Sequence, residues 1–260
     1  MSKTLAIILN HNLPELTDNL YESLEPNNRD IRDLFVMDNG SKPNLKSKYT
    51  YFHLEKNLFW GGALNFAFHY MLKHDKYDSL LFLNNDIEVN GEIFIKSLRE
   101  ELFKNALAII SPCIAGKANP WKQMQCWGSN KIRVVDWIDM QAPLFHRKII
   151  EEIRQFDEKL ILGWGQELIC QLTCNKNHWN TGVCDFISMV HFAKQTFETR
   201  MLENSDVNGS QFRDSPIVDH DSYGEMATKL MQQYFMEKGH NYDELHEYGR
   251  SYNVNSIKTL

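Results

Sequence analysis

Leu80-Leu81-Phe82-Leu83-Asn84-Asn85-Asp86 is the stretch from which the fold can be worked out. Four apolar residues followed at once by polar ones are typical of a strand buried in a parallel sheet. Ligands of open α/β sheets bind at the carboxyl ends of such strands, so we expect Asp86 to lie where chemistry is done. A carboxylate beside two carboxamides offers oxygen ligands suited to Mg²⁺ or Mn²⁺. An ordinary turn is the alternative interpretation of the same residues.

Strands and amphipathic helices alternate on both sides of this stretch. A buried strand is predicted at 5–9, a second strand at 33–37 and an edge-like strand at 49–54. Helices are predicted at 13–24, with Asn12 as the N-cap, and from Gly61 onwards. This alternation over about the first 110 residues predicts βαβ units, and therefore an α/β fold with a mostly parallel central sheet flanked by helices.

The regular alternation of strands and helices ends after residue 110. The segment 111–139 is rich in Pro, Gly and Trp and predicts strands and loops, whereas 201–223 is polar and predicts a linker. We therefore divide the chain into residues 1–110, residues 111–200 and an extension at 201–260. The remaining predicted elements are helices at 93–103, before Phe156 and at 167–177, strands at 106–110 and 183–190, and a final helix with Met226, Leu230, Met231, Tyr234 and Phe235 on one face.

Composition excludes several classes of protein. With 43% hydrophobic and 24% charged residues, the chain is of the folded globular class rather than disordered. A net charge of −6 argues against nucleic acid as a partner, because phosphate binding relies on clustered Lys and Arg. We expect no transmembrane segment and no signal peptide, since no apolar run is long enough and the first residues lack a cleavage site. Five scattered cysteines favour a reduced, cytoplasmic protein.

Polar clusters follow three of the predicted strands. They are Asn10-His11-Asn12, Asp38-Asn39-Gly40-Ser41 and Asn84-Asn85-Asp86. Because parallel strands end at the same edge of a sheet, we expect the three clusters to converge on one crevice. Asp38 there could accept hydrogen bonds from a nucleobase or a ribose. Each residue of its cluster is also a good turn former, so a simple turn is the alternative.

Two glycines open the helix within Asn57-Leu58-Phe59-Trp60-Gly61-Gly62-Ala63-Leu64-Asn65. Backbone amides at such a helix start can approach a diphosphate, helped by the helix dipole. The segment has neither the G-x-G-x-x-G spacing of a dinucleotide site nor the lysine of a P-loop. A tight turn with Trp60 in the core is the alternative.

Glu167 and His191 are the remaining residues that point to chemistry. Glu167 ends the segment Gly163-Trp164-Gly165-Gln166-Glu167, and a single positioned carboxylate is what a general base requires. His191 follows a predicted strand and is a metal ligand only if a carboxylate lies nearby. An ordinary helix N-terminal glutamate and a structural histidine are the alternatives.

Taken in order, these segments resemble the GT-A fold of the inverting glycosyltransferase family 2. The matching motifs span about residues 4 to 195 and are Val36–Ser41, Asn57–Asn65, Leu81–Glu88, Phe156–Glu158, Gly163–Glu167 and His191. The resemblance implies a nucleotide-sugar donor and a divalent cation, Mn²⁺ or Mg²⁺. It makes residues 1–110 the nucleotide-sugar-binding half and 111–200 the acceptor-binding and catalytic half of one domain, with 201–260 as a linker and C-terminal helical extension.

The same resemblance assigns roles to individual residues. Asp86 takes the last position of the family's D-x-D motif and binds the metal together with His191, while Asp38 contacts the donor base. Two departures stand out: the motif is Asn84-Asn85-Asp86, with one carboxylate, and the family's acidic pair is reduced to Glu167 followed by Leu168. The base is therefore Glu167 itself or a residue elsewhere. The implied donor-binding residues are Asn10, Asn12, Asp38, Asn39, Asn57, Gly61, Gly62, Asn65, Asn84 and Asn85.

The implied reaction is a single displacement that inverts the anomeric carbon. Glu167 takes a proton from a hydroxyl of a glycan, glycolipid or glycoprotein acceptor, and the donor carries UDP or dTDP. Aromatic faces stack on sugar rings, so Trp127, Trp137 and Trp164 are candidate acceptor residues, with packing in the core as the alternative. Family members of this size often build surface polysaccharides, which suggests polysaccharide biosynthesis in the cytoplasm or at the membrane periphery.

Two other functions remain open. One is a catalytically inactive GT-A-fold scaffold or sugar-binding protein, suggested by the weakened D-x-D and acidic-pair motifs. The other is a sugar nucleotidyltransferase, although Asn10-His11-Asn12-Leu13-Pro14 lacks the glycines and arginine usual near the first strand of that class. The apolar face of the final helix packs on its own chain, forms a homodimer or lies near a membrane, of which an anionic bilayer is the least favoured because of Glu225, Glu237, Asp243 and Glu244.

Overall fold

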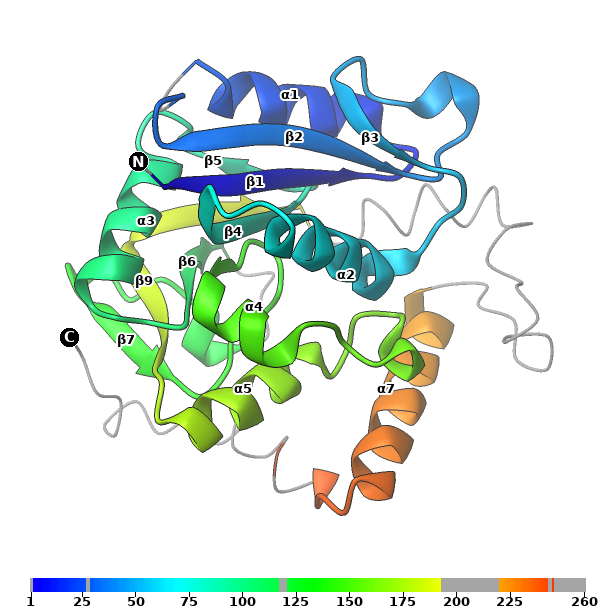
Figure 1. Ribbon diagram of the computed structural model, residues 1–260, viewed down its shortest axis with the longest axis vertical. Coiled ribbons are helices and arrows are strands. Elements are labelled where there is room, and N and C mark those ends of the chain that lie inside the picture. The colour runs from blue at the N-terminus through cyan, green and yellow to red at the C-terminus, as the bar shows by residue number, and fades with distance from the viewer. Residues whose placement is uncertain (1, 27–28, 117–120, 193–219, 243–244, 246–260) are drawn as a thin grey trace.

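The computed structural model describes residues 2–26, 29–116, 121–192, 220–242 and 245, shown in Figure 1. The helices of these residues are α1 (Pro14–Leu24), α2 (Phe59–Leu72), α3 (Phe94–Lys104), α4 (Arg147–Ile153), α5 (Gln166–Asn177) and α7 (His220–Glu237). The strands are β1 (Lys3–Asn10), β2 (Arg32–Asn39), β3 (Thr50–Leu54), β4 (Tyr77–Asn84), β5 (Ile87–Val89), β6 (Ile109–Ala115), β7 (Ile132–Val135), β8 (Leu144–His146) and β9 (Thr181–His191). Short 3-10 turns η1 (Pro43–Leu45), η2 (Lys122–Met124) and η3 (Glu158–Leu160) complete them.

One sheet forms the centre, in the order β3-β2-β1-β4-β8-β6-β9-β5, with β7 paired to β9. The first four strands of this order are parallel, as predicted for the first half of the chain. Leu80 to Leu83 are fully buried, because helices cover both faces: α1 lies on one side of β1 and β2, and α2 and α4 lie on the other (Figure 1). The predicted α/β fold is confirmed.

The second half of the sheet is mixed rather than parallel. β8 is antiparallel to both β4 and β6, and β9 runs parallel to β6 but antiparallel to β5 and β7. The pairing of β5 with β9 places Ile87 opposite His191. The residue just before β5 is Asp86, so this pairing brings the end of β9 to the end of the buried strand β4.

The α1 helix begins differently from the prediction. Leu13 occupies the N-cap position without a side-chain hydrogen bond, and Pro14 begins the helix, where its fixed φ is already helical. Asn12 was the predicted cap, but its backbone is left-handed (φ +59°) and its Oδ1 accepts from the Lys42 amide at 2.9 Å. The N-cap prediction is wrong because Asn12 bridges to the next loop instead.

The apolar face of α7 packs on its own chain. Met231 and Phe235 join a buried cluster with Trp137, Leu160 and Leu168. Tyr223 and Ala227 join a second one with Leu162. This face therefore packs on its own chain, as one of the alternatives predicted, and the homodimer stays a prediction.

A buried ion pair holds the segment after β6 against β9. Arg133 donates from Nε to Asp185 Oδ1 at 2.9 Å, and from its terminal nitrogens to the carbonyls of Gln123 and Gln125. Both side chains of the pair are essentially inaccessible to solvent. Cys113 and Cys126 form a disulfide across the same segment. The expectation that all cysteines are reduced is thus wrong for this pair, whereas Cys170, Cys174 and Cys184 are free and buried.

We expect Asp185→Ala to lower the free energy of unfolding by about 3–5 kcal/mol, because it leaves the buried guanidinium of Arg133 without its counter-charge. Urea unfolding followed by circular dichroism measures the change. Glu152→Ala is the matched control, since Glu152 pairs with Lys176 at the surface at 2.8 Å. An exposed pair contributes little. Equal midpoints for the two variants would contradict the prediction.

Candidate active site

The candidate site lies at the carboxyl edge of the parallel strands. Registers pair Asn10 with Asp38, Asp38 with His53, and Leu9 with Asn84, so the polar residues that follow the strands stand side by side. The predicted convergence of the three polar clusters on one edge is borne out by these registers.

Asp38 is completely buried in this edge. Its Oδ1 accepts from Asn10 Nδ2 at 3.2 Å, and its Oδ2 pairs with His53 Nδ1 at 2.9 Å. The Asp38 side chain is 0% exposed, whereas that of His53 is 47% exposed. In this arrangement the imidazole, and not the carboxylate, is the group that meets solvent.

Asn10 and Asn12 hold the loop that follows β2. Asn10 Nδ2 also donates to Ser41 Oγ at 3.2 Å, and its Oδ1 accepts from Thr17 at 2.9 Å. The Asn12 backbone amide donates to Ser41 Oγ at 2.9 Å. All polar atoms of the Asn10 side chain thus have protein partners, so this side chain shapes the crevice from beneath.

Asn39 and Asn57 join the end of β2 to the start of α2. Asn39 Nδ2 donates to Asn57 Oδ1 at 2.9 Å, and the Leu58 amide donates to Asn39 Oδ1 at 2.9 Å. Asn57 Oδ1 accepts in addition from the Phe59 amide at 2.8 Å. This carboxamide pair is the reason that α2 begins at Phe59, two residues before the predicted glycine start.

The glycines and Asn65 of α2 serve packing. The Gly61 amide donates to the Ile161 carbonyl at 3.2 Å and the Gly62 amide to that of Leu58 at 3.1 Å. A Cβ on Gly61 would lie 2.9 Å from the Leu160 carbonyl oxygen, so glycine lets the backbone of the segment before α5 approach closely. Asn65 binds both the amide and the carbonyl of Phe156, at 2.7 and 2.9 Å. Both glycine amides have backbone acceptors in this structure, and their contact with a diphosphate stays a prediction.

Asn84 and Asn85, the first two residues of the D-x-D-like motif, form hydrogen bonds with protein side chains. Asn84 Oδ1 accepts from Trp60 Nε1 at 2.8 Å, and its Nδ2 donates to Gln141 Oε1. Asn85 Nδ2 donates to Thr17 Oγ1 at 2.9 Å. A carboxylate at position 84 could not donate to Gln141, so the departure from D-x-D matches the neighbours that these residues have.

Asp86 and His191 form the polar pair at the end of β4 and β9. Their Oδ2 and Nε2 atoms lie 3.4 Å apart, and Asp86 is only 5% exposed. Burial by itself lowers the pKa of His191, but the hydrogen bond and charge of Asp86, with the charge of Asp139, outweigh it and raise that pKa. Asp86 Oδ1 is buried without any hydrogen-bond partner. Such an atom requires an explanation, and a bound cation is one.

The donor set fits a divalent cation such as Mn²⁺, which accepts both carboxylate oxygen and imidazole nitrogen. Among the residues that the structure describes there is no group of three or more His, Cys, Asp or Glu side chains able to hold a metal. Asp86 and His191 would therefore supply two ligands, leaving the other positions to a substrate or water.

Glu167 lies in the first turn of α5. Gly165 precedes the helix with φ +91°, a conformation that favours glycine, and its amide donates to both carboxylate oxygens of Glu167 at 3.1 and 3.0 Å. Burial raises the pKa of Glu167 to about 7; the backbone amides of Glu167 and Gly165 oppose this shift, and the charge of Asp139 adds to it. A carboxylate with such a pKa is suited to act as a base near neutral pH.

Asp139 belongs to the same site and was missed from the sequence. It lies between β7 and β8, where Gln141 Nε2 donates to its Oδ1 at 3.4 Å. Burial raises its pKa, His191 and Gln141 oppose the shift, and Asp86 adds to it. The charge of Asp139 raises the pKa of both His191 and Glu167. No local pattern marks it, because it lies in the irregular segment between Val135 and Leu144.

The three candidate acceptor tryptophans have different surroundings. Trp137 is 5% exposed and packs in the cluster beneath α7, so its predicted acceptor role is wrong and the core alternative holds. The Arg133 guanidinium lies 4.1 Å from the Trp127 ring centre, which anchors that ring in the buried network. Trp164 is 40% exposed in the loop before Glu167, edge-on to Tyr223.

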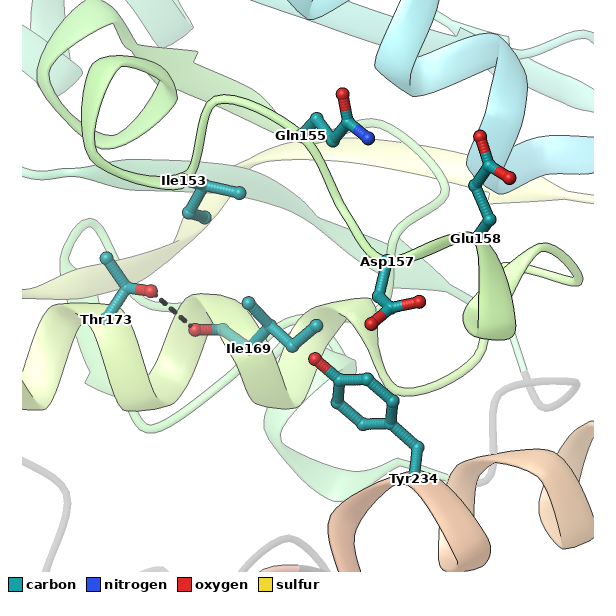
Figure 2. A pocket seen from close by; sticks show the side chains of 7 residues that line it. All are labelled: Ile153, Gln155, Asp157, Glu158, Ile169, Thr173 and Tyr234. Carbon is teal, nitrogen blue, oxygen red and sulfur yellow. Dashed lines mark hydrogen bonds between the residues drawn. The ribbon is translucent and has the colours of Figure 1, made fainter. Parts of the chain in front are cut away.

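A separate hollow of about 550 Å³ lies away from these residues (Figure 2). Its walls come from the segments around α4, η3 and α5 and from Tyr234 of α7, whose phenol points toward Asp157 (Figure 2). It contains none of the residues predicted to carry chemistry. The lining residues are Ile153, Gln155, Asp157, Glu158, Ile169, Thr173 and Tyr234.

Comparison with known proteins identifies the fold. No protein-family model matches the chain, and neither does any curated protein. Among solved structures, the chain is similar to residues 1–349 of TarS from S. aureus, with 13% identity and a TM-score of 0.57 over 90% of this chain and 72% of that one. The same protein in complex with UDP gives 12% identity and 0.56, over 97% and 76%. The mannosyltransferase PcManGT from Pyrobaculum calidifontis, in complex with GDP-Man and Mn²⁺, gives 12% and 0.55, over 96% and 73%.

These similarities confirm the predicted GT-A fold, because they extend over most of each chain. At such low identity they concern the arrangement of the backbone alone. No helix in the described part of the chain combines the length and the apolarity needed to cross a bilayer.

Proposed function

We propose that this protein is an inverting glycosyltransferase that moves a sugar from a nucleoside-diphosphate sugar to a hydroxyl group of a glycan, glycolipid or glycoprotein. Support comes from the GT-A fold that it shares with TarS and with PcManGT, whose structures contain UDP and GDP-Man with Mn²⁺ respectively. The proposal includes Mn²⁺ or Mg²⁺ as the cation, UDP or dTDP in the donor, and a role in polysaccharide biosynthesis in the cytoplasm or at the membrane periphery.

One observation carries the proposal. The Asp86–His191 pair lies where β4 and β9 end, at the sheet edge where ligands of α/β proteins bind, and the charge of Asp139 raises the pKa of both His191 and the half-buried Glu167. A metal-binding pair beside a carboxylate of raised pKa is what transfer from a diphosphate to a hydroxyl requires.

The residues divide the reaction between them. Asp86 and His191 would hold a divalent cation, which would supply positive charge to the departing diphosphate. Glu167 accepts the proton of the acceptor hydroxyl as its oxygen attacks the anomeric carbon from the face opposite the leaving group. Trp164, exposed beside Glu167, offers its ring to the acceptor sugar. The products are the inverted glycoside and a free nucleoside diphosphate.

The direct test incubates the protein with UDP-, dTDP- and GDP-sugars, with and without Mn²⁺, and follows nucleoside diphosphate release by chromatography. We expect release from one donor class that requires the metal and increases on addition of a glycan acceptor. Metal-dependent binding without any release would instead favour the inactive scaffold.

We expect kcat/KM for transfer to rise with pH and to level off above about 7, because Glu167 must be ionised to accept a proton and its pKa is about 7. The raised pKa of Glu167 also makes the free energy of unfolding depend on pH. A carboxyl whose pKa is raised on folding stabilises the protein below 4.5, and this contribution is lost as the pH rises through about 7. Initial rates between pH 5 and 9 measure the first effect, and a flat profile would contradict it.

A further inference from the structure

We propose that Tyr223 and Met231 of α7 are positioning residues: they hold the turn 162–165, and this turn holds the carboxylate of Glu167. The inference rests on the proposed function and adds to it two residues that lie outside every motif of the family resemblance. Both act through the backbone of the turn rather than by touching the substrate.

The turn 162–165 holds Glu167 through one backbone amide. Gly163 and Gly165 have φ values of +97° and +91°, a conformation that favours glycine. The Gly165 amide donates to both carboxylate oxygens of Glu167, at 3.1 and 3.0 Å. A rotation of this peptide would therefore move the carboxylate or release it.

Each of the two glycines is packed against a different helix. A Cβ on Gly163 would lie 3.2 Å from Trp60 Cβ of α2. A Cβ on Gly165 would lie 3.0 Å from Met231 Cγ of α7, and 3.2 Å from Phe235 Cε2 of the same helix. Because the glycines carry no side chains, both helices contact the backbone of the turn directly, and its position depends on both.

A hydrogen bond from α7 fixes the start of the turn. The Tyr223 hydroxyl donates to the Leu162 carbonyl, and the two side chains are buried in one cluster with Ala227. Met231 belongs to the neighbouring cluster, which contains Leu168 of α5. Tyr223 thus holds one end of the turn, and Met231 holds the other end beside the first turn of α5.

The groups around Glu167 give this contact a measurable sign. Burial raises the pKa of Glu167 to about 7 and the charge of Asp139 adds to the rise, whereas the amides of Glu167 and Gly165 oppose it. The thiol of Cys170, on the same helix, stays neutral because burial raises its pKa. A turn that loosens weakens the opposing contact of the Gly165 amide, so the pKa of Glu167 should rise further.

The residues of α7 at the turn bring no charge of their own. Met231 and Phe235 are apolar, and Tyr223 contributes a neutral hydroxyl that is already donated to a carbonyl. Replacing them therefore changes the pKa of Glu167 through the position of the turn and not through a lost charge.

The first test compares two changes of tyrosine to phenylalanine on one helix. Tyr223→Phe removes the hydroxyl that holds the turn, whereas Tyr234→Phe, the matched control, removes a phenol oxygen that points toward Asp157 in the hollow (Figure 2). We expect Tyr223→Phe to lower kcat for transfer by about 2- to 12-fold, the usual net contribution of one hydrogen bond, with the donor Kd unchanged. The pH at which kcat/KM reaches half its plateau should rise, as initial rates between pH 5 and 9 would measure.

Met231→Ala tests the other end of the turn. It removes the side chain that packs on Gly165, and Met236→Ala is its control because Met236 is 69% exposed on the same helix. We expect the same rise in the pH of half-maximal kcat/KM for Met231→Ala alone. Loss of a buried methionine destabilises a protein, so Tyr223→Phe carries the test if Met231→Ala fails to fold.

A titration without turnover separates this inference from the proposed function. Carbon-13 NMR of protein with labelled glutamate carboxyls follows the ionisation of Glu167, whose resonance is the one absent from Glu167→Gln. We expect Glu167 to titrate at a higher pH in Tyr223→Phe than in the wild type, and Tyr234→Phe to match the wild type. Equal titration in the two variants would overturn the inference while leaving the proposed function intact. A wild type that releases no nucleoside diphosphate from any nucleotide sugar would overturn the proposed function, and the titrations would still decide whether α7 positions Glu167.

Discussion

Glu167→Gln is expected to lower kcat for sugar transfer by about 10²–10⁴-fold, the usual contribution of a positioned general base, with the donor Kd changed by less than about threefold. Glutamine keeps the size of the side chain and an acceptor oxygen for the Gly165 amide, which now donates to the carboxylate at 3.1 and 3.0 Å. The loop before α5 should therefore keep its shape. What is lost is the ability to take a proton, and the rise of kcat/KM towards pH 7 should disappear together with the rate.

The measurement is single-turnover transfer with saturating donor, so that product release does not hide the chemical step. Glu158→Gln is the control, because Glu158 lines the separate hollow and carries the same chemical change away from the site. If Glu167→Gln retained wild-type kcat, the base would have to be another residue, and Asp139 would be the first to examine.

Asp86→Asn is expected to weaken metal-dependent donor binding by at least about 10- to 100-fold, since even the residues that merely support a metal ligand contribute this much. Asparagine keeps the shape of the side chain, so the change falls on charge. The unpartnered Asp86 Oδ1 would become a carboxamide atom, and the charge that pairs with His191 would be lost. Without metal, the mutant and the wild type should bind donor alike, and weakly.

Calorimetry of nucleoside diphosphate with and without Mn²⁺, on both proteins, measures this difference. Asp157→Asn serves as the matched control, because Asp157 is an acid of the hollow in Figure 2. Binding that ignores both the metal and the substitution would contradict a metal site at Asp86, and the buried orphan oxygen would then need another explanation.

The sequence predicted the framework of the site because parallel strands end at one edge. The apolar run 80–83 located the central strand, and the polar residues that follow the strands were expected to converge, as the registers confirm. His191 could be placed near Asp86 only through the family resemblance. Physically, the contact depends on the antiparallel pairing of β5 with β9, which joins residues a hundred positions apart and leaves no local pattern.

What could not be predicted is which polar side chains face a ligand and which face the protein. Asn10, Asn39 and Asn65 were expected to bind the donor, but their carboxamides are occupied by neighbouring backbone and side-chain groups. An asparagine carboxamide can hydrogen-bond to buried backbone groups as well as to a ligand. The residue type alone therefore does not distinguish the two uses. Asp139 was missed for the related reason that a loop acid has no periodicity to mark it.

The contact between α7 and the loop before α5 affects the order in which the chain can fold during synthesis. Tyr223 donates to the Leu162 carbonyl, and a Cβ on Gly165 would lie 3.0 Å from Met231 Cγ, so the helix closes directly over the turn that sets Glu167. On the ribosome, the sheet and both halves of the site emerge before this helix does. The surroundings of Glu167 are therefore completed last, and a chain that has not yet been synthesised through α7 lacks the helix that packs over this turn.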